Sequence, residues 1–275
     1  MKAIYFGLLA LLLFLSAACR TDKAGGDAPA AAADSASAVA DTVAADSASA
    51  DPPRAADGLF DDFVYSFMRN ARFQRERIAF PLHNRTDGTD SPIAEKDWRF
   101  DRMYSRQDTY TLIFDSEASV KAEKDTSLSH VIVEWVYLDK RRVKQYVFDK
   151  TGGLWRLTAI ERHALEKNVN ADFYDFYARF STSAAFQAAH IRNPFAFKTY
   201  DSDGFQTIEG VLDVEQWPDY RPALPAHTIT NINYGQSYGD KRRRVLMLCS
   251  QSGGMGCLLS FERHGKSWRL TRLEN

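Results

Sequence analysis

The chain has 275 residues, of which 35 are Lys or Arg and 36 are Asp or Glu, so its formal net charge at pH 7 is −1. A chain this close to neutrality has no bulk attraction for nucleic acid or for a charged surface, and we expect no nucleic acid among its partners. Its length leaves room for two small domains.

The first residues resemble an export signal. Lys2 supplies a positive charge, Ile4–Leu15 is apolar, and three small residues precede Cys19. This apolar stretch is typical of a signal peptide, since a membrane-spanning helix needs about 20 residues. Small residues before a cysteine resemble a bacterial lipobox, although Leu15 lies one place further from the cysteine than usual. We predict that residues 1–18 are removed and that Cys19 is lipidated; ordinary secretion is the alternative.

Residues 19–57 are predicted to be a disordered tether. They are mostly Ala, Ser, Asp, Gly and Pro and contain no aromatic residue, so they have too little apolar surface to offset the entropy of ordering. Ser35, Thr42 and Ser47 follow aspartates in a pattern that resembles an O-glycosylation sequon of some Gram-negative anaerobes. The same pattern arises easily by chance in such a composition.

The rest of the chain consists of two segments of similar sequence, offset by 113 residues. Trp155-Arg-Leu-Thr158 returns as Trp268-Arg-Leu-Thr271, and Gln74 returns as Gln187. The pattern predicts two tandem repeats, 58–165 and 170–275. Gln74 and Gln187 are expected to bond a backbone group where the chain turns.

Each repeat is expected to be an α+β unit with an N-terminal helix packed on a curved antiparallel sheet. In the first repeat, apolar residues at helical spacing predict an amphipathic helix over 59–71. Segments with a period of two predict the four strands Tyr110–Asp115, Val131–Leu138, Val143–Asp149 and Trp155–Ile160.

These segments resemble a family of lipoproteins of Gram-negative anaerobes, a domain of unknown function. The resemblance lies in Asp62–Phe67, Phe73–Leu82, Glu134–Asp139, Gln145–Phe148 and Gly153–Thr158 and covers the whole folded part. It implies a cone-shaped fold of the nuclear-transport-factor-2 type and no assigned catalytic residue. Together with the signal, it implies a lipid-anchored protein of the cell envelope, with the outer membrane favoured, facing the periplasm or the cell surface.

Aromatic and charged residues gather in the loop of each repeat that precedes the long strands. Loops of this composition are also typical of a binding rim, although loop packing is the commoner explanation. The candidate binding residues are Trp98, Arg99, Asp101, Tyr104, Trp217, Tyr220 and Arg221.

Cys249 and Cys257 flank the Gly-rich turn Ser250–Gly256. Counting inward from both cysteines pairs them across this turn, and an exported chain enters an oxidising compartment. The sequence therefore predicts a disulfide between Cys249 and Cys257; two buried thiols are the alternative.

No two of the 6 histidines stand at metal-ligand spacing, and no Cys-x-x-Cys or Gly-x-Ser-x-Gly motif occurs. We therefore predict no metal, no cofactor and no catalytic residue. The sequence favours a non-catalytic module that binds an unknown small ligand or an envelope protein. An isomerase or hydrolase that uses a cone pocket, and a structural component of envelope assembly, are the alternatives.

Overall fold

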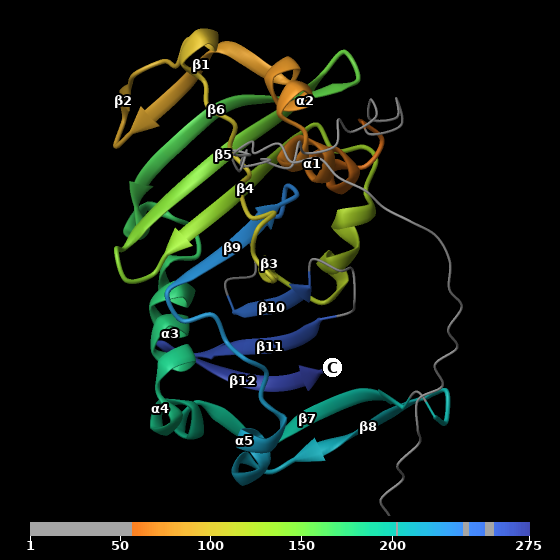
Figure 1. Ribbon diagram of the computed structural model, residues 1–275. Coiled ribbons are helices and arrows are strands. Elements are labelled where there is room, and N and C mark those ends of the chain that lie inside the picture. Colours follow the sequence, from red (N-terminus) through yellow and green to blue (C-terminus); the bar gives the residue numbers. More distant parts are fainter. Residues whose placement is uncertain (1–56, 202, 239–241, 251–255) are drawn as a thin grey trace, which may run out of the picture. The chain divides into compact units, whose positions relative to one another are not determined.

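The computed structural model describes residues 57–275 except 202, 239–241 and 251–255 (Figure 1). The predicted signal peptide, the lipidation site Cys19 and the glycosylation sites Ser35, Thr42 and Ser47 lie outside the described residues. We call residues 57–169 the first half and residues 170–275 the second half.

The first half contains two helices followed by strands, in the order that the sequence predicts. The elements are α1 (Phe60–Arg69), α2 (Ala71–Glu76), β1 (Ile78–Thr86), β2 (Thr89–Asp90), η2 (Glu95–Asp97), β3 (Thr109–Phe114), η3 (Ala118–Lys124), β4 (His130–Tyr137), β5 (Arg142–Thr151) and β6 (Leu154–Ala164). The helix expected over 59–71 and the four expected strands are confirmed to within a few residues at each end.

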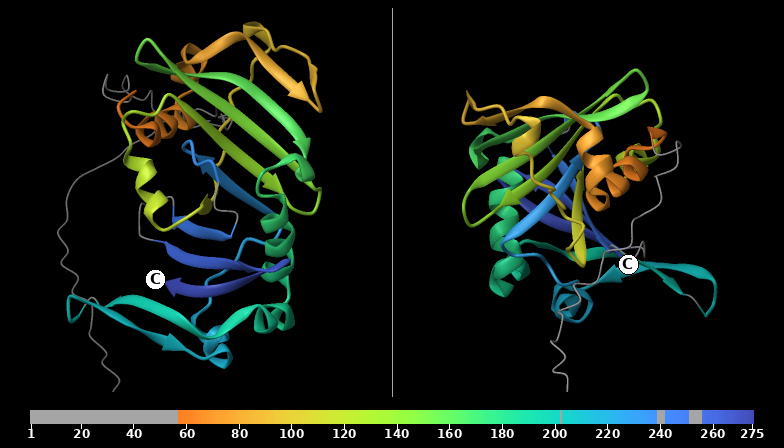
Figure 2. Two further views of the ribbon diagram at one scale, coloured as in Figure 1. Left: turned by 180° about the vertical axis from the view of Figure 1, so that it is seen from behind. Right: turned by 45° about the horizontal axis from the view of Figure 1, so that its top comes forward.

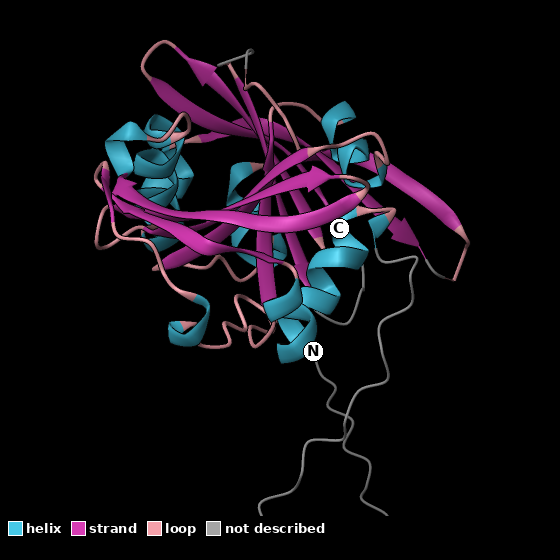
Figure 3. Cartoon of the chain, turned by 90° about the horizontal axis from the view of Figure 1, so that it is seen from above, coloured by secondary structure: helices cyan, strands magenta, loops and turns pink. Residues whose placement is uncertain are grey.

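A short helix η4 (Leu165–Lys167) leads to the second half, which has a closely similar element order. Its elements are α3 (Ala171–Thr182), α4 (Ala184–Ala189), β7 (Ile191–Asp201), β8 (Gln206–Leu212), η5 (Val214–Gln216), α5 (Trp217–Tyr220), β9 (Thr228–Asn233), β10 (Arg243–Ser250), β11 (Cys257–His264) and β12 (Ser267–Glu274). The helices lie at the outside of the strands (Figure 3).

Each long helix ends next to a polar residue that caps the following helix. α1 buries one apolar face, which includes Phe60, Phe63 and Phe67. Asn70 then leaves the helical conformation, and its side chain accepts a hydrogen bond of 3.0 Å from the backbone N–H of Phe73. Ser183 caps α4 in the same way. None of the described helices is long and apolar enough to cross a membrane.

The strands form two six-stranded sheets that exchange one strand. The first sheet has the order β2-β1-β6-β5-β4-β9, and the second has the order β3-β10-β11-β12-β7-β8. Strand β9 of the second half thus pairs with β4, and strand β3 of the first half pairs with β10. The expectation that each repeat keeps a sheet of its own is therefore wrong for these two strands.

The sheets are also mixed rather than purely antiparallel. β1 runs parallel to β6, and β7 runs parallel to β12. In each half, the strand that follows the two helices thus lies beside the last strand of the same half. β4, β5 and β6 do form the expected antiparallel meander.

The two exchanged strands, β3 and β9, lie side by side (Figure 2). They meet at a pair of buried threonines. The N–H of Thr111 donates to Thr230 Oγ1 at 2.8 Å, and the N–H of Thr230 donates to Thr111 Oγ1 at 2.9 Å. Each hydroxyl also donates to the carbonyl of the other residue, at 2.5 and 3.0 Å. Beside them, the N–H of Ile113 donates to Asn231 Oδ1 at 2.8 Å. These bonds satisfy backbone groups that have no other strand at this point.

Each hydrophobic core combines residues of both halves. The core under α1 contains Phe148 and Trp155 of the first half with Ile232 and Tyr234 of the second half. The core under α3 contains Ile113 and Val136 of the first half among second-half residues. Neither half therefore buries its apolar surface by itself.

We expect Thr111→Val to destabilise the fold by about 1–3 kcal/mol, because it leaves the buried N–H and C=O of Thr230 without their partners. The matched control is Thr109→Val, at an exposed position of the same strand, which should change stability by less than about 0.5 kcal/mol. Urea unfolding of both variants measures the difference. Equal stability of the two variants would contradict the role of the crossing.

Candidate functional site

The two tryptophans predicted to line a binding rim are structural. Trp98 and Trp217 are buried, and their Nε1 atoms donate to Gln74 Oε1 at 3.2 Å and to Gln187 Oε1 at 2.9 Å. The Nε2 atoms of the same glutamines donate to the carbonyls that end the preceding helix, those of Phe67 and Phe180. The expected role of Gln74 and Gln187 at the chain turn is therefore confirmed.

The other predicted binding residues do not form one site. Asp101 pairs with Lys144 at 3.1 Å and accepts a bond of 2.5 Å from the Tyr146 hydroxyl. Burial alone would raise the pKa of Asp101, but the charge of Lys144 and these bonds hold it below its usual value.

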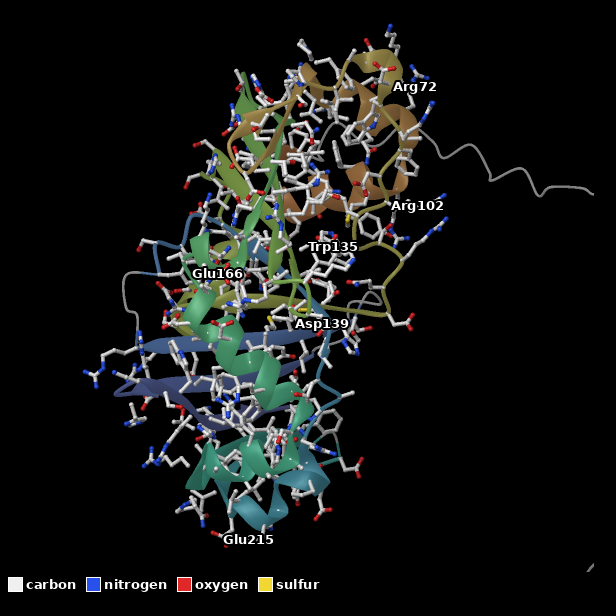
Figure 4. All side chains as sticks on the ribbon, turned by 90° about the vertical axis from the view of Figure 1, so that its left-hand side faces the viewer. Arg72, Arg102, Trp135, Asp139, Glu166 and Glu215 are labelled. Carbon is white, nitrogen blue, oxygen red and sulfur yellow. The ribbon has the colours of Figure 1, made fainter. Side chains whose placement is uncertain are left out.

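Arg221 donates to Gln187, Tyr220 packs on Phe197, and Arg99 is exposed. The neighbouring Arg102 lies over the ring of Phe100 at the outer side of the molecule (Figure 4). Of the seven candidates, only Tyr104 lines the pocket described below.

The expected disulfide is absent, since Cys249 and Cys257 are both free and buried. The register of β10 and β11 pairs Cys257 with Leu248, one residue away from Cys249. Because successive residues of a strand point to opposite faces, Cys249 joins the core under α1 and Cys257 joins the core under α3. Burial raises the pKa of each thiol to about 12, so both stay protonated at neutral pH.

The feature best suited to hold a ligand is a pocket of about 340 Å³ beside α1, which we call the Asp61 pocket. It combines four tyrosines, two carboxylates and a few apolar side chains. Residues of both halves line it, because the exchanged strand β9 brings its end against α1. The lining residues are Asp61, Asp62, Val64, Tyr65, Met68, Tyr104, Tyr110, Ile232, Tyr234 and Ser250.

Asp61 is the chemically distinctive group of this pocket. It lies in the first turn of α1, and its Oδ1 accepts a hydrogen bond of 2.8 Å from the hydroxyl of Tyr234. Burial raises its pKa to about 6; the bond from Tyr234 opposes the rise, and the charges of Glu123 and Asp62 add to it. Burial also raises the pKa of Tyr104 and Tyr234, so both hydroxyls keep their protons.

The second half has no carboxylate at the position that corresponds to Asp61. Tyr174 follows Phe173 in α3 as Asp61 follows Phe60 in α1, and it is fully buried. Its hydroxyl donates to Glu134 Oε2 at 3.3 Å.

Glu134 is the centre of a polar network that fills this region. Its two oxygens also accept bonds from Gln145, Asn168 and Asn231, at 2.7 to 3.0 Å. Asn231 in turn donates to the hydroxyl of Tyr238. Four donors and close packing leave Glu134 4% exposed, so it has no room for a ligand.

A cavity of about 430 Å³ on the second sheet is larger, and several of its charged side chains are paired. Arg243 pairs with Glu262 at 3.2 Å, and Arg272 pairs with Glu274 at 2.8 Å. The hydroxyl of Ser260 donates to Glu117. The Asp61 pocket is the stronger candidate site, because it combines tyrosines with a carboxyl whose pKa is raised.

Sequence reasoning missed Asp61, Tyr110 and Tyr234. An aspartate in the first turn of a helix interacts favourably with the helix dipole. This structural explanation is sufficient for Asp61, so the sequence gives no reason to expect a functional role. The signal that does exist is a mismatch between the repeats: Asp61 and Tyr174 differ although Phe60 and Asp62 are matched by Phe173 and Asp175.

Comparisons with known proteins agree with the fold. The family described as "Domain of unknown function (DUF4348)" matches residues 39–275. Among solved structures, the chain is similar to the crystal structure of an NTF2-like protein from Bacteroides fragilis NCTC 9343 at 2.15 Å resolution. The two share 40% sequence identity, the match covers 81% of this chain and 97% of that chain, and the TM-score is 0.74. No match was found among curated proteins. The described residues have a mixed α+β fold of the NTF2-like type.

We expect both cysteines to react as free thiols once the chain unfolds. Iodoacetamide in denaturant without reductant should modify the peptides of Cys249 and of Cys257, because the two sulfurs lie on opposite faces of a sheet. Peptide mass spectrometry measures the modification. A peptide pair linked through these residues would overturn the observed register.

We expect Asp61→Asn to stabilise the protein at neutral pH. Below about pH 4 the carboxyl is protonated in folded and unfolded chains alike, so it has no effect. Above pH 6 it is ionised in both, and the raised pKa makes the folded chain less stable by up to about 3 kcal/mol. Stability of the parent protein should therefore fall between pH 4 and 6 relative to the variant.

Urea unfolding at several pH values measures this difference, and asparagine keeps an oxygen that accepts the bond from Tyr234. A pH-independent difference between the two proteins would show that Asp61 is ordinary in its titration.

Proposed function

Since this chain belongs to the DUF4348 family, we propose its function from the chemistry of its own pocket: it is a cell-envelope lipoprotein that binds a small molecule in the Asp61 pocket. The single observation that carries the proposal is the pocket itself, where a carboxyl of raised pKa lies among tyrosines in a space of about 340 Å³. Ligand sites typically combine an apolar lining with a few polar groups and a perturbed pKa.

The envelope location rests on the first residues. The apolar segment Ile4–Leu15 and the small residues before Cys19 support export and lipidation. Acyl chains on Cys19 would hold the protein at a membrane, and the Ala-, Ser- and Asp-rich segment 19–57 would carry the folded part away from its surface. We propose the outer membrane of a Gram-negative bacterium as the site.

We further propose that the two halves descend from one duplicated module. Phe60 packs edge-on against Phe148 and Trp155, with ring centroids 5.4 and 5.0 Å away. Phe173 packs in the same manner against Phe261 and Trp268, at 5.4 and 5.3 Å. These matched contacts, and the matched bonds of Gln74 and Gln187, support the proposal. After duplication, the first module carries a carboxyl at Asp61, and Tyr174 fills the corresponding position of the second module.

Native mass spectrometry of the protein from its own host tests the binding function and the lipidation together. The expected mass begins at Cys19, carries acyl chains and includes a retained small molecule. Asp61→Tyr should lose the molecule, because it introduces the residue that fills the corresponding position at Tyr174. Asp97→Tyr, at an exposed position of η2, is the matched control and should retain it. No retained molecule in any preparation would contradict the binding function.

An isomerase or hydrolase is the second candidate function, favoured by the same carboxyl. A group with a pKa of about 6 can accept and return a proton near neutral pH, and the Tyr234 hydroxyl can donate a hydrogen bond to a developing charge. Incubation of a host metabolite extract with a small amount of protein separates the two. Conversion of many molecules per protein, lost in Asp61→Asn, would favour the enzyme; stoichiometric retention without conversion favours binding.

A further inference from the structure

We infer that the Asp61 pocket binds an organic cation, such as a quaternary ammonium or a primary amine, an inference that rests on the proposed binding function. Its basis is the joint placement of carboxylates and tyrosine rings around one space. The charge, the rings and the apolar lining each favour this class of ligand independently.

The charge of the pocket is negative. Asp61 and Asp62 line it, and Glu123 of η3 acts on the Asp61 carboxyl from another side. Asp62 and Glu123 disfavour the ionised form of Asp61, and no ion pair joins Asp61 to a basic side chain of the described residues. A bound cation would therefore relieve this repulsion. An anionic ligand would add to this repulsion.

The rings supply the second contribution. Four tyrosines line the pocket. The rings of Tyr104 and Tyr110 pack on each other with centroids 5.2 Å apart and Tyr234 stacks on Phe114, so the exposed Tyr65 presents the most open ring. The face of an aromatic ring carries negative electrostatic potential and attracts ammonium groups, which is the basis of aromatic cages for methylated amines. At the rim, the guanidinium of Arg69 already lies over the ring of Tyr65, 4.3 Å from its centroid.

The remaining lining fits the carbon atoms of such a ligand. Val64, Met68 and Ile232 offer apolar contacts to methyl and methylene groups. The volume of about 340 Å³ is at the small end of ligand sites, which suits a compact amine better than a large ring system.

The affinity should depend on pH, because Asp61 adds its negative charge to the pocket only when its carboxyl is ionised. The groups that face or act on Asp61 from the surrounding elements are Asp62 of α1, Tyr104, Tyr110 of β3, Glu123 of η3, Tyr234 after β9 and Cys249 of β10. Of these, the tyrosines and the cysteine have raised pKa values and stay neutral. Asp61 is therefore the group expected to control binding near pH 6.

Calorimetric titration with choline tests the inference, and 3,3-dimethyl-1-butanol is its neutral isostere. Choline should bind at least about tenfold more tightly than the alcohol, and Asp61→Asn should remove most of that preference. At about pH 5 choline should bind about tenfold more weakly than at about pH 7.5, because about a tenth of the Asp61 carboxyls are then ionised. Asp97→Asn is the matched control and should bind like the parent protein.

The inference is overturned if the alcohol binds as well as choline, if Asp61→Asn binds choline unchanged, or if choline, tetramethylammonium and putrescine all fail to bind. In that case the retained molecule separates two conclusions. If the retained compound is neutral or anionic and Asp61→Tyr loses it, the proposed binding function stands and only the inference of a cationic ligand is contradicted. The absence of any retained compound would remove both.

Discussion

Two buried threonines join strands β3 and β9, and the rest of the architecture depends on this contact. Thr111 and Thr230 exchange four hydrogen bonds where β3 and β9 cross, and this crossing lets each half lend a strand to the sheet of the other. Buried backbone groups must find partners, so the side chains of the two threonines replace the missing strand neighbour. The two sheets are therefore one cooperative structure rather than two adjacent domains.

The exchange also builds the candidate site. β9 passes from the second half to the edge of the first sheet and brings Ile232 and Tyr234 against α1. Tyr234 meets Asp61 there, and the pocket forms between side chains that lie 173 positions apart in sequence. A pocket assembled in this way depends on the strand crossing as much as on its own lining residues.

The two halves have a similar order of helices and strands, but their interiors differ. Under α3, Tyr174 and the network around Glu134 of β4 fill the interior, and four donors satisfy the buried carboxylate. In the first half, Asp61 receives one hydrogen bond from Tyr234 and lies near two like charges, which makes its ionised form unfavourable. A protein retains such a group against its own stability where function requires it, which supports a functional first half and a structural second half.

Sequence patterns predicted the local structure well because they depend on local rules. Helical spacing located α1, alternation located β3 to β6, and the repeated glutamines indicated the turn that Gln74 and Gln187 secure. Alternation predicts which face of a sheet a side chain lies on, but not which strands are neighbours. The exchange of β3 and β9 could therefore not be predicted from the sequence. The predicted disulfide is wrong for a related reason. A shift of one residue in the register places Cys249 and Cys257 on opposite faces of the sheet. For Trp98 and Trp217 the structure favours loop packing, the commoner interpretation of these aromatic loops, because both bond to the glutamines.

The most direct test of this account is a carbon-13 NMR titration of the Asp61 side-chain carboxyl in the folded protein. The account predicts a pKa of about 6, raised by burial beside Tyr234 and by the charges of Glu123 and Asp62. A pKa near the ordinary value of 3.8 would mean that the carboxyl is solvated, and the pocket as described here would not exist.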